Sequence, residues 1–427
     1  MTRYRFPWSV GLVLLLSAAW PGLGRSATIT VEPGQSINDG IRQLQSGDTL
    51  LVKNGTSTEP LDANSIPNGS QNTPTIVKAE TPGGVIIRPE GNINGSLIAV
   101  GGDKQWIVID GFVLDLANTG YSGGGLDLNA TNGARDILIQ NLEIRNKKAD
   151  DFSDGSNNDY LTTAGIGATG AASNIVMRNV HVHDIGMNCG TGQCCNECYG
   201  YGIYLSGNGY TLENSEFYNI SGWAVHGYTS APDNASDNIL RNNVFRDSGG
   251  PVLLCQRNNQ IYNNILLRLG TLGKKEASGI QLAGSCAGQP STDNKIYHNT
   301  IVGSNGACIN LGYSSQGTVQ NNICWHNGTD AVEGGEGGNT VDHNLLGTDP
   351  RFVNVDQGDF HLQAGSPAID AGVQIEGRAF QGAAPDLGAC EVGEQTCGGP
   401  GTTTPPSHVA VPPPTHLRLV PGAKAQR

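Results

Sequence analysis

A short pattern of apolar and polar positions recurs between Ile109 and Leu346. An apolar residue is followed two positions later by Asn or His, once by Gly, and a second apolar residue stands three positions further on. The middle positions are Gly111, Asn141, Asn179, Asn214, Asn242, Asn263, His298, Asn321 and His343. Intervals of about 21 to 38 residues between copies indicate a solenoid, in which strand lengths are fixed and loop lengths vary.

A second apolar-x-apolar triplet follows most copies of the pattern. The triplets are Leu126–Leu128, Ile166–Ala168, Ile203–Leu205, Val225–Gly227, Val252–Leu254, Ile280–Leu282, Ile309–Leu311 and Val332–Gly334. Alternation with period two predicts strands with one face turned inward. Paired helices are excluded because the units are β-branched, rich in Gly and Asn, and short between breakers. We therefore expect an all-β solenoid with at least two strands in each coil.

Stacking of such coils brings equivalent residues into columns about 4.8 Å apart from rung to rung. Inward columns of Ile, Leu, Val and Phe form the core, and each such side chain stabilises by roughly 1.5–3 kcal/mol on burial. The recurring Asn is predicted to stand at a bend and to donate its side-chain amide to its counterpart one coil away. At the N-terminal edge, helical spacing from Ser36 to Leu44, with Ser36 as N-cap, predicts a short capping helix.

Units such as Asn294-Lys-Ile-Tyr-His-Asn-Thr-Ile301 resemble the right-handed parallel β-helix repeats of the pectate-lyase-like superfamily. The resemblance covers residues 28–393 and implies a single-stranded right-handed parallel β-helix. The stretch from Asp349 to Gly372, followed by "APDLGACE", is similar to a closing segment that ends the stack. The superfamily contains lyases, hydrolases, epimerases and inert surface proteins, so the resemblance specifies the fold more closely than the reaction.

The two ends of the chain differ from the repeats. Residues 1–27 carry Arg3 and Arg5, then an apolar run, then small residues, which predicts a signal peptide too short to remain as a membrane span. Residues 394–427 are rich in Pro and Thr and are expected to form a disordered tail. We therefore expect a secreted, periplasmic or cell-surface protein, monomeric, with no membrane span in the mature chain.

The net charge of −13 argues against nucleic acid as a partner and against unaided capture of a polyanion. A bound Ca²⁺ could reconcile the acidic chain with an acidic glycan, and the candidate ligands are Asp150, Asp151, Asp154 and Asp159. Their spacing does not match an EF-hand. A solvated acidic loop is the simpler interpretation.

Ten cysteines in an exported chain predict disulfide bonds. Cys189, Cys194, Cys195 and Cys198 crowd one loop, where disulfides are favoured over a zinc site because the usual paired Cys-x-x-Cys motifs are missing. Cys390 and Cys397 are candidates to staple the C-terminal end. Cys255 and Cys286, which follow equivalent strands, are candidates for another bridge.

One outward column of the second strand is predicted to hold the functional groups. Coil by coil it reads Asp127, Gly167, Tyr204, His226, Leu253, Gln281, Asn310 and Glu333, and a second column two residues on includes Asn129 and Tyr228. Insertions after Asn146, Gly186 and Thr229 are expected to wall the coils of Tyr204 and His226. These coils are therefore the expected groove, with a polysaccharide or cell-surface glycan as partner.

The leading hypothesis for this groove is β-elimination or epimerisation of a uronate by a polysaccharide lyase or epimerase. His226, Tyr204 and Tyr228 would act as base and acid, while Asp127, Asn129 and Gln281 would bind the substrate. The alternative is a non-catalytic protein whose aromatic residues only stack on sugars or on one another. Hydrolysis needs a carboxyl pair about 5–9.5 Å apart. It is excluded on this face, since the acids of the column, Asp127 and Glu333, are expected roughly 34 Å apart.

Charged residues near the first strand, among them Arg178, Glu213 and Arg241, show no evident column in the sequence. Isolated charges are usually ordinary surface, which is the interpretation we give them.

Overall fold

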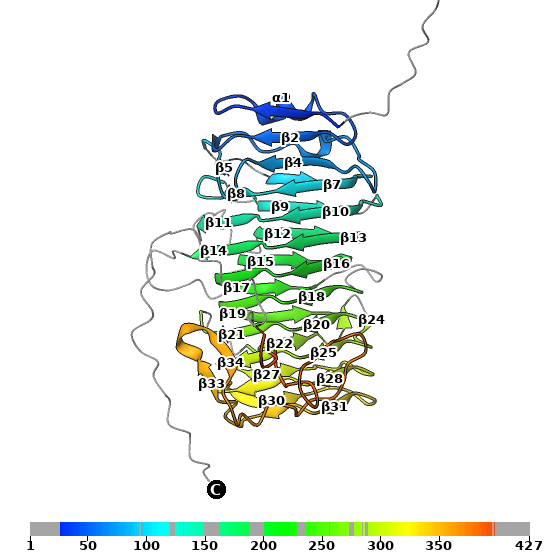
Figure 1. Ribbon diagram of the computed structural model, residues 1–427, viewed down its shortest axis with the longest axis vertical. Coiled ribbons are helices and arrows are strands. Elements are labelled where there is room, and N and C mark those ends of the chain that lie inside the picture. The colour runs from blue at the N-terminus through cyan, green and yellow to red at the C-terminus, as the bar shows by residue number, and fades with distance from the viewer. Residues whose placement is uncertain are drawn as a thin grey trace, which may run out of the picture.

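The computed structural model is a solenoid in which the chain winds through stacked coils (Figure 1). The structure describes residues 26–394 and 397, apart from 92, 94, 120–123, 131, 149–162, 188–199, 229–235, 256, 273–276, 284 and 287–288. Strands of successive coils pair in parallel at matching register. The predicted right-handed parallel β-helix is therefore confirmed, whereas the signal peptide and the Pro/Thr-rich tail fall almost wholly outside the described residues and stay predictions.

The first face of the solenoid, face A, is a 12-stranded parallel sheet. Its strands, in stacking order, are β1 (Thr28–Val31), β2 (Thr49–Val52), β4 (Thr75–Ala79), β7 (Gln105–Asp110), β10 (Arg135–Gln140), β13 (Ala171–Arg178), β16 (Asn208–Glu213), β18 (Ile239–Arg241), β20 (Gln260–Tyr262), β25 (Lys295–Tyr297), β28 (Thr318–Gln320) and β31 (Thr340–Asp342). The apolar residue before each recurring Asn or His lies on this face.

The second face, face B, is one ladder of an 18-stranded sheet. Its strands are β3 (Gly55–Ser57), β5 (Val85–Ile87), β8 (Phe112–Asp115), β11 (Glu143–Lys148), β14 (His181–Met187), β17 (Glu216–His226), β19 (Val244–Leu254), β21 (Ile265–Leu269), β26 (Thr300–Val302), β29 (Ile323–Trp325) and β32 (Leu345–Leu346). The apolar residue after each recurring Asn or His lies here.

The third face, face C, is the other ladder of that sheet and carries the apolar triplets. Its strands are β6 (Ser96–Val100), β9 (Gly124–Asn129), β12 (Thr163–Thr169), β15 (Gly200–Leu205), the C-terminal halves of β17 and β19, β22 (Ile280–Leu282), β27 (Ala307–Asn310) and β30 (Thr329–Glu333). Strands β17 and β19 run unbroken from face B into face C and so join the two ladders into one sheet.

The recurring Asn or His is a one-residue corner between faces A and B. Asn214, Asn242 and Asn263 have φ of 51°, 54° and 54°, a left-handed conformation that Asn tolerates better than most residues. They stand in single file, since the Asn214 N–H donates to the Arg241 carbonyl and the Asn242 N–H to the Tyr262 carbonyl. The register on which the column argument depends is therefore confirmed.

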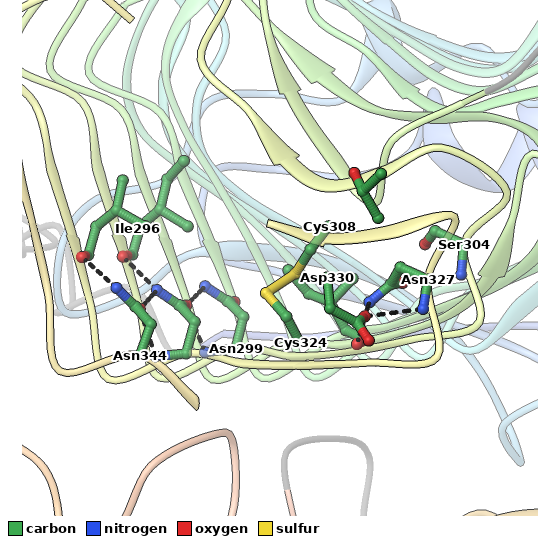
Figure 2. Close-up of a disulfide and its surroundings, with 12 residues drawn as sticks. Ile296, Asn299, Ser304, Cys308, Cys324, Asn327, Asp330 and Asn344 are labelled. Carbon is green, nitrogen blue, oxygen red and sulfur yellow. Dashed lines mark hydrogen bonds between the residues drawn. A yellow bond between two sulfur atoms is a disulfide. The ribbon is translucent and has the colours of Figure 1, made fainter. Parts of the chain in front are cut away.

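In the later coils a continuous amide ladder runs through the residue after the corner, from Asn243 through Asn264, Asn299 and Asn322 to Asn344. Asn264 Nδ2 donates to Asn299 Oδ1 at 3.0 Å, and Asn299 Nδ2 donates to Asn322 Oδ1 at 3.0 Å; Figure 2 shows this ladder. The corner side chains pair only locally, as where Asn179 Nδ2 meets Asn141 Oδ1 at 3.2 Å. The predicted ladder is present but displaced by one position, because the successors Asn264, Asn299 and Asn322 point inward and are 0% exposed.

The core consists of the inward columns of the three faces. On face B, for example, Leu114, Ile144, Val182, Phe217, Phe245, Leu266 and Ile301 succeed one another in register and are all 0% exposed. Cys324 continues this column and forms a disulfide inside the solenoid with Cys308 of face C (Figure 2). This bridge was not predicted from the sequence.

The N-terminal end of the stack carries the helix α1 (Ile37–Ile41) (Figure 1). The Ser36 side chain caps it by accepting from the Asp39 N–H at 3.1 Å. Ile37 and Ile41 are buried, and Gly40 allows close packing because a Cβ there would lie 2.6 Å from Val31 Cγ2. The helix is shorter than the spacing from Ser36 to Leu44 predicts, and its role in protecting the sheet edge stays a prediction.

The C-terminal segment does not end the stack. It includes the hairpin β33 (Phe352–Asn354) and β34 (Asp359–Leu362), joined by the short helix η3 (Val355–Gln357), and folds back beside the last coils (Figure 1). It covers the apolar outward residues Ile265, Leu267, Val302 and Ile323 of face B. The last coil itself remains open, with Val341 44% and Leu346 41% exposed.

The remaining short elements are η1 (Ala63–Ser65) and the hairpin β23 (Ser285–Cys286) with β24 (Gln289–Pro290). The predicted Cys390–Cys397 disulfide is confirmed. Cys255 is also disulfide-bonded, but the Cys286 side chain and the loop of Cys189, Cys194, Cys195 and Cys198 lie outside the described part of the chain. In the described segments no helix is long and apolar enough to span a membrane.

Candidate functional site

The predicted outward column exists on face C. Backbone pairing places Asp127, Gly167, Tyr204, His226, Leu253, Gln281, Asn310 and Glu333 in one register. Tyr204 and His226 are direct neighbours in this column. The insertions expected to wall these coils lie mostly outside the described residues.

Aromatic rings gather where β15 and β17 pair, and we call this group the aromatic patch. The His226 ring lies 5.2 Å from Tyr204, 5.9 Å from Tyr228, 4.8 Å from Tyr201 and 5.0 Å from Trp223, measured between centroids. These distances fall in the range of favourable aromatic contacts. The three residues predicted as catalytic are therefore brought together, with His226 at the centre.

Tyr201 and Trp223 belong to the aromatic patch but were missed from the sequence. Their rings lie 5.5 Å apart on β15 and β17, and they stand three residues before Tyr204 and His226, whereas strict alternation would require two. The extra residue, Gly202 in β15, is buried at the corner between faces B and C, where a Cβ would lie 2.7 Å from both Phe217 and Ile220 side chains. The sequence signal that could have revealed them is an aromatic residue directly before a small corner residue, as in Tyr201-Gly202 and Trp223-Ala224.

His226 is uncharged at neutral pH. Burial lowers its pKa to about 4, because desolvation disfavours the charged ring. Its Nδ1 is buried and has no hydrogen-bond partner among the described residues. A buried polar atom without a partner costs about 1–3 kcal/mol, so a ligand hydroxyl that reaches this nitrogen would bind with a gain.

The two tyrosines beside His226 differ in exposure. Burial, and secondly the neighbouring Tyr228, raise the pKa of Tyr204, so its phenol stays protonated at neutral pH. Tyr228 is 43% exposed, which is unusual for so large an apolar ring. The patch therefore presents a rim that faces solvent and a protonated hydroxyl beside an uncharged imidazole.

The residues predicted to bind substrate lie on both sides of the patch. Asp127 is two rungs before Tyr204, across Gly167, and Asn129 is exposed on the same strand, β9. Gln281 lies two rungs after His226, beyond Leu253. Burial raises the pKa of the Asp127 carboxyl, which has no ion pair within the described residues. The structure thus arranges these residues along one line but does not bring Asp127 and Gln281 together.

The predicted calcium ligands Asp150, Asp151, Asp154 and Asp159 lie outside the described residues. In the part of the chain that is described, no cluster of three or more His, Cys, Asp or Glu residues could hold a metal ion. Lys147, next to that loop, is only 1% exposed, and its Nζ donates to the Thr119 carbonyl and hydroxyl oxygens at 3.2 and 3.1 Å.

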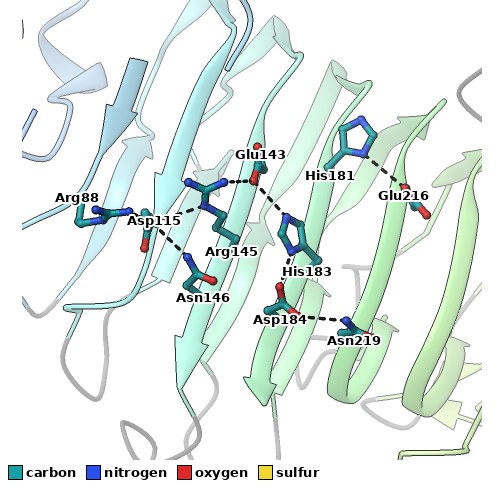
Figure 3. Close-up of polar contacts among 10 residues, drawn as sticks. All are labelled: Arg88, Asp115, Glu143, Arg145, Asn146, His181, His183, Asp184, Glu216 and Asn219. Atoms are coloured by element: carbon teal, nitrogen blue, oxygen red, sulfur yellow. Dashed lines mark hydrogen bonds and ion pairs between the residues drawn. The ribbon is translucent and has the colours of Figure 1, made fainter. Parts of the chain in front are cut away.

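A second candidate is a polar network on the outer side of face B (Figure 3). Glu143 accepts from Arg145 Nη1 at 2.6 Å and lies 3.2 Å from His183 Nε2, and His183 Nδ1 lies 2.8 Å from Asp184. Burial alone would raise the pKa of Glu143, but His183 and Arg145 overcome it and lower the pKa to about 2. The carboxylate is therefore already neutralised by its neighbours.

The basic members of this network are equally occupied. Burial would lower the pKa of His183, but Asp184 and Glu143 raise it. The His183 ring stacks on the Tyr218 ring, with 4.7 Å between centroids. The Arg246 guanidinium lies over the same Tyr218 ring, 4.0 Å from its centroid. Because each charge has an opposite charge at hand, we assign the network to holding the coils together.

The charges on face A also form a column, contrary to the interpretation as isolated surface charges. Arg178, Glu213 and Arg241 are in register on β13, β16 and β18. Glu213, 4% exposed, accepts from Arg178 Nε at 2.5 Å and Arg241 Nε at 2.7 Å. The interpretation as isolated surface charges was wrong because each of the three residues stands directly before a recurring Asn, and residues at the same distance from that corner share one register.

Comparison with known proteins supports the architecture. A family profile described as "Right handed beta helix region" matches residues 164–346. No curated protein matches the chain in sequence.

Several solved structures resemble the chain at low identity. An alginate lyase from Paenibacillus sp. str. FPU-7 is 14% identical with a TM-score of 0.47, covering 75% of this chain and 99% of that one. Pectate lyase Pel9A is 15% identical with a TM-score of 0.42, covering 87% and 97%. The A-module of Azotobacter vinelandii mannuronan C-5 epimerase AlgE6 is 12% identical with a TM-score of 0.42, covering 73% and 93%. Likeness at this level concerns overall architecture and carries no assignment of reaction or substrate.

Proposed function

We propose that this right-handed parallel β-helix protein is carbohydrate-active and binds a polysaccharide at the aromatic patch. The observation that supports the proposal most strongly is the gathering of Tyr201, Tyr204, Trp223, His226 and Tyr228 on two neighbouring coils. Rings with an apolar face and a polar edge suit sugars, which present C–H groups on their faces and hydroxyls around their edges. Tyr228, which is 43% exposed, offers its phenol hydroxyl to such a group.

The finer proposal is that the patch also catalyses β-elimination or C5 epimerisation of a uronate. The support for it is the adjacency of an uncharged His226, able to take a proton, and a protonated Tyr204, able to give one. Both reactions also need a group that neutralises the sugar carboxylate. The described neighbours of the rings on face C include no Lys or Arg, so a bound cation such as Ca²⁺ would have to serve. Binding is therefore the function that the geometry supports best, and elimination is the second candidate.

The experiment for binding is affinity electrophoresis and calorimetry of the full chain against a panel of neutral and acidic polysaccharides. We expect at least one glycan to bind and His226→Ala to weaken it about tenfold or more, since the central ring contact is lost. His343→Ala is the matched control, because His343 is exposed on the last coil. If wild type binds no glycan, or if both variants bind like wild type, the proposal is wrong.

The experiment for catalysis uses pectate, alginate and glycosaminoglycans, with and without Ca²⁺. Elimination would give unsaturated products that absorb in the ultraviolet, and epimerisation would exchange solvent deuterium into the sugar. Loss of either signal in Tyr204→Phe with retained binding would support catalysis. Binding without either signal would leave the non-catalytic alternative.

A further inference from the structure

Beside the aromatic patch, β12 presents small residues where its neighbours present large ones. Gly167 stands between Asp127 of β9 and Tyr204 of β15, and Ala164 stands opposite Tyr201. Neighbouring strands are about 4.8 Å apart, so the backbones that carry Asp127 and Tyr204 are separated by roughly 10 Å with no side chain between them at Gly167. This leaves a notch over Gly167. The Tyr204 ring lies on one side of the notch and the Asp127 carboxyl on the other.

Among the residues that the structure describes, none fills the notch on the side of Tyr204. A Cβ built at Gly167 would meet Asp127 Oδ1 at 3.5 Å and the Leu126 carbonyl at 4.0 Å, and nothing from β15 within 4 Å. Gly167 has no left-handed φ that would require a glycine. Close packing does not require one either, because both contacts are ordinary van der Waals distances. Neither the backbone conformation nor close packing therefore explains the glycine, and its effect is to leave space beside Tyr204.

Asp127 is the polar wall of the notch. Its carboxyl is half-buried and forms no hydrogen bond or ion pair with any residue that the structure describes. By contrast, the half-buried Glu143 and the buried Glu213 of the outer faces are held by Arg or His. A carboxylate without a partner in such a position is suited to accept hydrogen bonds from a ligand.

We infer that the notch between Asp127 and Tyr204, over Gly167, is a subsite for an uncharged sugar ring. One face of the sugar would pack against Tyr204, and its hydroxyls would donate to the Asp127 carboxylate. The inference rests on the proposed function, since it extends the same aromatic patch by one ring. It also narrows the ligand class, because a uronate in this subsite would place its carboxylate beside that of Asp127.

Charge around the notch supports a neutral ring rather than a uronate. The described outward residues next to it in register are Gly124, Ala164, Thr169, Asn129 and Ser206, and none is a cation. The whole chain carries a net charge of −13, which disfavours a polyanion further. We therefore expect the polysaccharide to be neutral, or at least to carry an uncharged residue at this position.

The test is calorimetry of the full chain with soluble neutral polysaccharides, namely xylan, glucan and galactomannan, and with pectate and alginate. Asp127→Asn removes the charge and keeps the shape, while Gly167→Leu fills the notch. Glu333→Gln is the matched control, because Glu333 occupies the same column at its far end. We expect a neutral glycan to bind wild type, Asp127→Asn and Gly167→Leu to weaken it about tenfold each, and Glu333→Gln to bind like wild type.

The outcomes separate this inference from the proposed function. If neutral glycan binding depends on His226 but not on Asp127 or Gly167, or if wild type binds only uronate polymers, the subsite is wrong and the aromatic patch survives. If wild type binds no glycan, both are wrong. Should Gly167→Leu fail to fold, Gly167→Ala and the unchanged fold of Asp127→Asn still decide the question.

Discussion

Replacing His226 by Phe should make the protein more resistant to acid. The Phe ring keeps the contacts with Tyr204 and Tyr201 but cannot take up a proton. In wild type the folded-state pKa of His226 is about 4, below its ordinary value of 6.5, because the ring is buried. Between these values the unfolded chain binds more protons at His226 than the folded one, so the contribution of His226 to wild-type stability falls as pH drops from 6.5 towards 4.

The size of the effect follows from the same shift. A separation of about 2.5 pH units corresponds to about 3 kcal/mol, fully lost once the pH is below 4. The variant lacks this loss. Its free energy of unfolding relative to that of the wild type should therefore rise by up to about 3 kcal/mol between pH 7 and pH 4. Urea unfolding of both proteins at several pH values measures it, with the exposed His343→Phe as control.

A difference in the free energy of unfolding between wild type and His226→Phe that stays constant across this pH range would refute the reasoning. It would mean that His226 is as well solvated in the folded protein as in the unfolded chain. The aromatic patch would then be more open than the ring distances indicate, and the neutral, unpartnered imidazole on which the binding proposal draws would not exist.

Other predictions concern the scaffold. Asn299→Ala removes the partner of the Asn264 N–H, the Asn322 Oδ1 and the Ile261 carbonyl, so urea unfolding should show a loss of about 3 kcal/mol or more, and a loss below 1 kcal/mol would contradict the ladder. Cys308→Ser should cost about 3 kcal/mol by the same assay, since the bridge closes a loop with a sequence separation of 16; equal stability of reduced and oxidised wild type would argue against it. Burial and the nearby Asp386 raise the folded-state pKa of Glu391 to about 7, so the contribution of Glu391 to stability should fall as pH rises from 4.5 to 7, opposite in sign to that of His226, and Glu391→Gln should remove this contribution and change the slope of stability against pH. An unchanged slope in the variant would show that Glu391 is not the group responsible.

The sequence predicted the columns of face C because period-two alternation and a constant register leave little freedom. The pairing of Gly167 with Tyr204, and of Tyr204 with His226, follows once Leu205 and Val225 are recognised as inward residues. The same reasoning missed Tyr201 and Trp223, since corners interrupt alternation. A buried Gly or Ala at a corner shifts every residue before it to the other face, and the pattern of apolar residues alone does not reveal where this happens.

The placement of the C-terminal segment was wrong for a different reason. Its resemblance to a closing segment concerns its own residues, whereas its position is decided by the surface that needs cover. The outward residues Ile265, Val302 and Ile323 of face B are apolar in the last coils, and the segment packs against them. In the middle coils the positions equivalent to Ile265 and Ile323 are Glu143, His181 and Glu216, which need no such cover. Reading the outward column as well as the inward one would have located the segment.

The most direct test of the binding proposal is the fluorescence of Trp223 during titration with a soluble oligosaccharide that the wild-type chain retains in affinity electrophoresis. Trp223 lies 5.0 Å from the His226 ring and 5.5 Å from Tyr201, so a sugar seated on these rings must change its surroundings. The account predicts a saturable change in emission that disappears in Trp223→Phe. An identical change in Trp223→Phe, or no change while the oligosaccharide binds, would place the glycan elsewhere and contradict the account.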